Sequence, residues 1–95
     1  MKRKPIDFKD LIVQAHALWS RQWLVLTCGD FAAGDFNSMT VGWGSFGVMW
    51  NLPFAMVVVR PGRYTREFME RYDTFTLCAL GKKYREALKI LGSTS

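Results

Sequence analysis

The amino-terminal part of the chain carries apolar residues at helical spacing. They recur three or four positions apart, as on one face of a helix: Phe8, Leu11, Ile12, Ala15 and Trp19. Because Asp7 stands where a cap is expected, the pattern predicts a helix over 8–19 that packs on a sheet. The same reasoning predicts a short helix capped by Thr65 and a final helix over 84–91 that ends at Gly92.

Strand-like segments alternate with turn-like ones through the middle of the chain. Residues 23–28 are apolar and rich in strand formers, and the segment 29–35 that follows has the composition of a hairpin loop. A second strand begins near Phe36 or Asn37, and the glycines of the following segment indicate either one bent strand over 38–46 or a close backbone approach. We therefore expect the first two strands to be antiparallel neighbours.

Two further strands complete the expected sheet. Pro53 restarts the chain, and the continuous apolar run over 54–59 is typical of a strand buried on both faces. Residues 74–80 have the composition of a fourth strand. The order helix, three strands, helix, strand, helix predicts an α+β or mainly β fold, or a partial β-barrel with flanking helices. Four strands do not close a barrel comfortably, so such a chain would supply part of a barrel or pair with a second copy.

Length and composition limit this picture further. The 95 residues fit a single domain, 1–95, and exclude a two-domain enzyme. An apolar content of 49% indicates a packed core, and in so short a chain it also favours association. The 13 basic and 8 acidic residues leave a net charge of +5, but they are scattered, which favours a solvated basic surface over a nucleic-acid site.

The sequence predicts a cytoplasmic protein without a membrane span. The longest apolar stretch, 52–59, is far shorter than the roughly 20 residues that cross a bilayer. The basic start at 1–5 is followed by charged residues where a signal peptide would have an apolar region. Cys28 and Cys78 lack the spacing of a metal or disulfide framework, so we expect reduced, buried thiols.

The sequence contains fragments of common catalytic and cofactor motifs, but the neighbouring residues that each motif requires are absent. Residues 42–47 match the letters of a dinucleotide-binding GxGxxG, but no helix is expected to open there and no acidic residue follows about 20 positions later. His16, the sole histidine, lies in the first predicted helix without a visible nucleophile partner. A metal site with Cys28 and Cys78 would require three different elements to converge. We therefore predict no catalytic side chain and no metal.

Two segments combine residues that suit a flat, anionic ligand. The first, 37–44, is a glycine-containing strand that exposes backbone groups, and Trp43 offers apolar contact. The second, 60–66, supplies Arg60 at a strand end and the Thr65 hydroxyl at a helix start, a combination suited to phosphate. The simpler alternative is that the arginines of 60–66 are solvated turn charges and that Trp43 belongs to the core.

The same two segments resemble the flavin reductase-like proteins with the FMN-binding split barrel, of the flavoredoxin type. The resemblance covers about residues 6–95 and is most specific over 37–43 and 59–65. In that family the Asn-x-x-Thr-x-x-Trp strand lies along the flavin, and the Arg-x-x-x-Tyr-Thr turn receives its phosphate. The resemblance thus implies an FMN site formed by Asn37, Ser38, Met39, Thr40, Val41, Gly42, Trp43, Arg60, Tyr64 and Thr65.

The resemblance also implies a function. Members of the family are NAD(P)H-dependent FMN oxidoreductases or electron carriers, in which the isoalloxazine carries the electrons and the protein orients it. They are dimers with the flavin at or near the interface, and they are considerably longer, so 1–95 resembles their amino-terminal half. We therefore expect FMN, a nicotinamide nucleotide and a second copy as partners. Two alternatives stay open: a basic β-domain that binds single-stranded nucleic acid, and an inactive half-domain that oligomerises.

Overall fold

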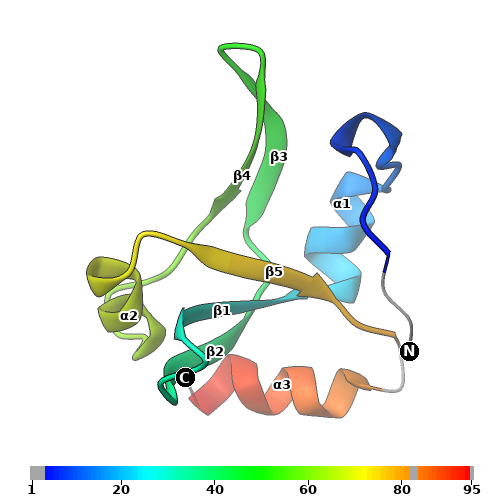
Figure 1. The fold of residues 1–95 in the computed structure, drawn as a ribbon. Coiled ribbons are helices and arrows are strands. Elements are labelled where there is room, and N and C mark those ends of the chain that lie inside the picture. The colour runs from blue at the N-terminus through cyan, green and yellow to red at the C-terminus, as the bar shows by residue number, and fades with distance from the viewer. Residues whose placement is uncertain (1–3, 82–83, 95) are drawn as a thin grey trace.

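The protein has an α+β fold whose strands form two antiparallel sheets (Figure 1). The computed structural model describes residues 4–81 and 84–94. Its elements are, in chain order, η1 (Phe8–Asp10), α1 (Ala15–Ala17), η2 (Leu18–Gln22), β1 (Leu24–Asp30), β2 (Asp35–Val41), β3 (Gly44–Met49), β4 (Leu52–Val57), α2 (Thr65–Arg71), β5 (Phe75–Ala79) and α3 (Arg85–Thr94). The α+β class predicted from the sequence is confirmed, and within the described residues the sheets do not close into a barrel.

β1 is the centre of the larger sheet, which has the order β2–β1–β5. Antiparallel pairing sets Leu26 opposite Met39 on one side and Leu77 on the other. Alternate residues of β1 are buried, as in a strand with one face on the core. The buried cluster on that face consists of Trp19, Leu24, Leu26, Met39 and Val41. The strands predicted over 23–28 and 74–80 are therefore confirmed.

Different helices cover the two faces of this sheet. Side chains of β2 alternate between the faces, so Asn37 and Thr40 point to opposite sides. Asn37 contacts Thr65 at the start of α2, whereas the Thr40 hydroxyl donates to the carbonyl oxygen of Leu88 in α3. β2 thus lies between α2 on one face and α3 on the other.

A separate hairpin, β3–β4, stands away from the larger sheet (Figure 1). Trp50 and Asn51 form its turn with φ of 53° and 62°, the left-handed conformation of a type I′ hairpin turn. The prediction of one bent strand over 38–46 is wrong, whereas the alternative interpretation of its glycines, a close backbone approach, is confirmed at Gly44. The segment forms two strands that belong to different sheets, with Gly42 and Trp43 between them.

Gly44 allows the hairpin to begin directly against the core. A Cβ at this position would lie 2.6 Å from the Trp19 ring, so only glycine permits the ring and the strand to approach this closely. Trp19 also packs on Phe46, with 5.3 Å between the ring centroids. These contacts hold the base of the hairpin where the chain leaves the larger sheet.

β4 is not the doubly buried strand that its apolar run predicts. The exposed fractions of Leu52, Phe54 and Met56 are 65%, 38% and 52%. Within the described residues β4 pairs with β3 alone, and the resulting two-stranded ribbon has apolar side chains open to solvent. The apolar run therefore marks a ribbon with one exposed face, and its other side packs on the core cluster through Val57 and Val59.

The amino-terminal helix predicted over 8–19 is also wrong in extent. Asp7 does cap a turn through its side chain, but that turn is only the three residues of η1. The backbone is not helical at Ile12 and Val13, β-branched residues with low helix propensity, and helix resumes only at α1. Of the predicted apolar stripe, Trp19 alone is buried among the described residues, so the stripe does not pack on the sheet.

The last helix extends beyond its predicted end. α3 continues through Gly92 to Thr94, because Gly92 keeps a helical conformation rather than the left-handed one of a C-cap glycine. No helix in the described part of the chain is long and apolar enough to cross a membrane.

Both cysteines are free thiols, but their surroundings differ. Cys28 is buried in β1, where its Sγ donates to the carbonyl oxygen of Thr74 at 3.3 Å, and burial raises the pKa of its thiol. Cys78 in β5 is only partly buried. The expectation of buried thiols is thus confirmed for Cys28, whereas Cys78 retains some access to solvent.

The substitution Gly44→Ala tests the contact between Trp19 and the base of the β3–β4 hairpin. We expect a loss of about 1–3 kcal/mol in the free energy of unfolding, because the added methyl overlaps the Trp19 ring and the Met56 carbonyl oxygen of the paired strand. Gly62→Ala is the matched control, since a Cβ there meets nothing within 4 Å. Urea unfolding followed by tryptophan fluorescence measures both variants. Equal stabilities would contradict the role given to Gly44.

Candidate functional site

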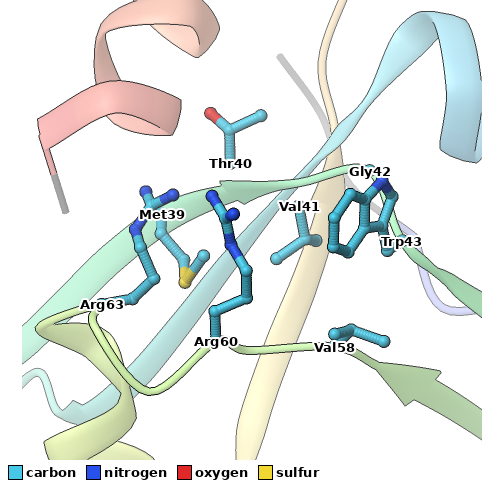
Figure 2. Close-up of a pocket in the computed structure, with 8 residues that line it drawn as sticks. All are labelled: Met39, Thr40, Val41, Gly42, Trp43, Val58, Arg60 and Arg63. Atoms are coloured by element: carbon cyan, nitrogen blue, oxygen red, sulfur yellow. The ribbon is translucent and has the colours of Figure 1, made fainter.

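A cavity of about 120 Å³ opens where the turn between β4 and α2 lies against β2 (Figure 2). Its lining residues come from two segments that the whole β3–β4 hairpin separates in the sequence: Met39, Thr40, Val41, Gly42, Trp43, Val58, Arg60 and Arg63. The structure thus brings most of the predicted site residues together around one cavity.

β2 forms the floor of the cavity through alternate side chains. Met39 and Val41 are buried, with exposed fractions of 4% and 3%, and they belong to the core cluster. Thr40 also borders the cavity, but its side chain points to the other face of the strand, toward α3 (Figure 2). Ser38 faces that same side, and its Oγ lies 2.8 Å from Thr27 Oγ1. The floor is therefore apolar and is held by the core.

Trp43 and Arg60 form a wall beside this floor. Trp43 is 62% exposed, so the alternative that it belongs to the core is wrong. The guanidinium carbon of Arg60 lies 5.6 Å from the Trp43 ring centroid, within the range of a cation–π contact. The backbone N–H of Val58 donates to the carbonyl oxygen of Trp43 at 3.0 Å and fixes the two segments at this point. An indole with a guanidinium beside it offers a ligand both flat apolar contact and positive charge.

Arg63 is a second cation at the cavity, and no sequence motif assigned it to the site. Its backbone N–H donates to the carbonyl oxygen of Arg60 at 3.1 Å, which closes a turn over Pro61 and Gly62. The first and fourth residues of such a turn are close together, and both arginine side chains reach the cavity (Figure 2). The sequence did contain a signal for Arg63: two arginines flank the turn-forming Pro61-Gly62 pair, so closure of the turn brings them together. Val58 was missed because its strand was expected to be buried.

Asn37 and Thr65 contact each other rather than the cavity. Asn37 Nδ2 donates to Thr65 Oγ1 at 2.7 Å, and Thr65 is fully buried. The prediction that Thr65 caps α2 is wrong: Tyr64 is the N-cap, no side chain bonds there, and the Thr65 hydroxyl is turned toward β2. Tyr64 is 55% exposed and packs edge-on against Phe68. Neither Tyr64 nor Thr65 is among the residues that line the cavity.

α2 is fastened to β2 at both ends. The bond between Asn37 and Thr65 holds its start. At its end, the Tyr72 hydroxyl donates to the Asp35 carboxylate, and Arg71 Nη1 lies 3.5 Å from the same carboxylate. The hydrogen bond to Asp35 raises the pKa of Tyr72 above its ordinary value. Because α2 directly follows the turn with the two arginines, these contacts fix that turn relative to the floor.

The charged groups at the cavity are all positive. Its lining residues include two guanidinium groups and no carboxylate, and the remaining side chains are apolar apart from Thr40. Such a site suits a ligand with one anionic part and one flat, apolar part. Nothing in this set of side chains is arranged as an acid–base or nucleophilic pair.

Comparison with known proteins identifies no relative. No family model matches the chain, and neither a curated protein nor a solved structure matches it significantly. The function therefore has to be inferred from the geometry of the site and from the resemblance of its motifs.

The pair Asn37 and Thr65 is open to a double-mutant test. Asn37→Ala and Thr65→Val should each reduce the free energy of unfolding by about 1–2 kcal/mol, because each removes a partner of a buried polar contact. The double variant should lose less than the sum, since both changes break one bond. Chemical denaturation of the four proteins measures the coupling. Strictly additive losses would contradict a direct bond between these side chains.

Proposed function

We propose that this chain binds FMN and serves as an NAD(P)H-dependent oxidoreductase or electron carrier of the flavin reductase-like kind. The observation that carries the proposal is the proximity of the two segments in which the resemblance is most specific. They line one cavity although the β3–β4 hairpin separates them in the chain. Sequence spacing alone does not require this proximity, so it supports the resemblance independently.

The residues present fit two parts of FMN. Arg60 suits the phosphate, since a guanidinium donates hydrogen bonds in pairs to phosphate oxygens. Trp43 offers an exposed aromatic surface to the isoalloxazine, and Met39 and Val41 supply an apolar floor. FMN supplies the electron chemistry when it is bound, so the work of the chain is to bind and orient it. This division agrees with a site that holds no acid–base pair among its lining residues.

The cavity is smaller than a complete ligand site. Its volume of about 120 Å³ lies below the roughly 300–1,000 Å³ that is usual for sites of small molecules. In the proposed complex the cavity takes the phosphate end of FMN, and the ring lies beside Trp43 on the open side. Additional surface from a second copy would then cover the ring.

The proposal includes a homodimer in which the two sheets contribute to a split barrel. The chain exposes 7613 Å², whereas a compact monomer of 10.9 kDa exposes about 5,600 Å². The surplus of roughly 2,000 Å² per chain exceeds the roughly 800 Å² that each partner buries in a standard interface and is within the range of obligate dimers. The β3–β4 hairpin contributes exposed apolar side chains, and no charged residue occurs between Asp35 and Arg60. A second copy packed on this hairpin would remove that surface from water.

FMN retention is the direct test of the proposed function. The purified chain, mixed with FMN and desalted, should keep a flavin absorption spectrum near one FMN per chain. Arg60→Ala should weaken binding by about 1.5–3 kcal/mol in a fluorescence titration, because a charge-assisted phosphate contact is lost. Arg66→Ala removes the same charge from α2, where Arg66 pairs with Glu70, and should leave the affinity nearly unchanged.

The outcomes separate the proposed function from its alternatives. A chain that releases all FMN refutes the flavoprotein proposal. Colourless protein with a strongly salt-dependent affinity for oligonucleotides would support the nucleic-acid alternative. Colourless protein that binds neither ligand and forms large assemblies would support an inactive half-domain.

The dimer proposal is tested on the hairpin itself. Leu52→Lys combined with Met56→Lys places two charges on one face of β4 and should convert the dimer to a monomer, because burial of unpaired ammonium groups is costly. Ile12→Lys is the matched control, since Ile12 is an apolar residue of 92% exposure outside the hairpin. Sedimentation velocity measures the state of each protein. A wild-type monomer, or a double variant that stays dimeric, would contradict the proposal.

A further inference from the structure

The turn between β4 and α2 directs two arginines to the same cavity. The hydrogen bond from the Arg63 N–H to the Arg60 carbonyl oxygen, 3.1 Å long, closes the turn over Pro61 and Gly62. Both side chains line the cavity, and Figure 2 shows them rising from the turn toward β2. Proline restricts the backbone of this turn, so the two arginines leave the chain at closely spaced, fixed positions.

The neighbouring arginines have different roles. Arg66 lies 3.3 Å from a carboxylate oxygen of Glu70, and Arg71 lies 3.5 Å from one of Asp35. These two ion pairs place carboxylates beside the arginines of α2, whereas the cavity lining contains no carboxylate. Two like charges at one cavity repel each other, and an anion between them relieves that repulsion.

Thr65 is not available for the same ligand. Its side chain is fully buried, and its hydroxyl accepts the 2.7 Å hydrogen bond from Asn37. To meet a phosphate it would have to leave the interface between α2 and β2. The position that the resemblance gives to Thr65 therefore has to be filled by another group, and Arg63 is the polar residue of the turn that reaches the cavity with Arg60.

We propose that Arg60 and Arg63 together clamp a phosphate monoester, with Arg63 in the role that the resemblance assigns to Thr65; this inference rests on the proposed binding of FMN. Near neutral pH a phosphate monoester carries a negative charge of about 1.5 to 2. It also has three terminal oxygens, which can accept hydrogen bonds from two guanidinium groups at once. In the pyrophosphate of FAD each phosphorus is substituted twice and has only two free oxygens and one negative charge. The clamp therefore selects FMN over riboflavin, which has no phosphate, and over FAD.

The test compares Arg63→Gln with Arg66→Gln against FMN and riboflavin. Arg63→Gln should weaken FMN at least about tenfold and leave riboflavin unchanged, because the lost contact is to the phosphate. Arg66→Gln removes an equal charge three residues away and should leave both affinities unchanged. Arg63→Lys should recover part of the FMN affinity, since it restores the charge without the paired donors. Thermal unfolding checks that every variant remains folded.

The possible outcomes distinguish failure of the phosphate clamp from failure of the proposed FMN binding. If Arg63→Gln binds FMN as the wild type does, or loses riboflavin and FMN equally, the clamp is overturned while FMN binding stands. If the wild type retains neither flavin, the proposed function fails, and calorimetric titration with inorganic phosphate tests the clamp alone. Phosphate binding that Arg63→Gln abolishes would still support the clamp. Absence of phosphate binding to the wild type would overturn it.

Discussion

The site depends on the attachment of α2 to β2. The turn with the two arginines is joined to the end of β2 through the Val58–Trp43 hydrogen bond and the Arg60–Trp43 contact, and the helix that follows the turn gives it further support. Asn37 binds Thr65 at one end of that helix, and Asp35 binds Tyr72 and Arg71 at the other. Both anchors come from β2, the strand that also forms the floor of the cavity. Hydrogen bonds and ion pairs of this kind are directional, so they fix an orientation that apolar packing alone would leave loose.

β2 serves two structural purposes because a strand presents alternate side chains to opposite faces. Met39 and Val41 join the core and the cavity floor, while Ser38 and Thr40 make hydrogen bonds on the other face. A contiguous motif in the sequence is therefore not a contiguous surface in space. Of the residues over 37–43, only those on one face and the backbone at the strand's end are able to meet a ligand in the cavity.

A sequence pattern predicts an element well when it depends on the chain's local properties, and poorly when the outcome depends on contacts between distant segments. Residues 23–28 and 74–80 were predicted correctly because both segments are rich in strand formers, although alternate positions are buried only in the first. The run over 54–59 was misread because a run of apolar residues does not show whether other parts of the same chain cover these side chains. Thr65 was misread because a hydroxyl at a helix start can cap the helix or bond to a neighbouring strand. Arg63 was missed because turn closure, not motif identity, brings it beside Arg60.

The hairpin and the cavity are coupled through Trp43, which connects β2 to β3 and is also a wall of the cavity. The hairpin is a two-stranded ribbon, an arrangement that is marginal without further apolar cover. Whatever covers the hairpin therefore also borders the open side of the cavity. In the proposed complex the phosphate clamp anchors one end of FMN within a single chain, and the ring extends to the side where Trp43 meets this uncovered ribbon. In that complex the turn with the two arginines supplies the affinity for FMN. The surface at the base of the hairpin controls which electron donors and acceptors reach the ring.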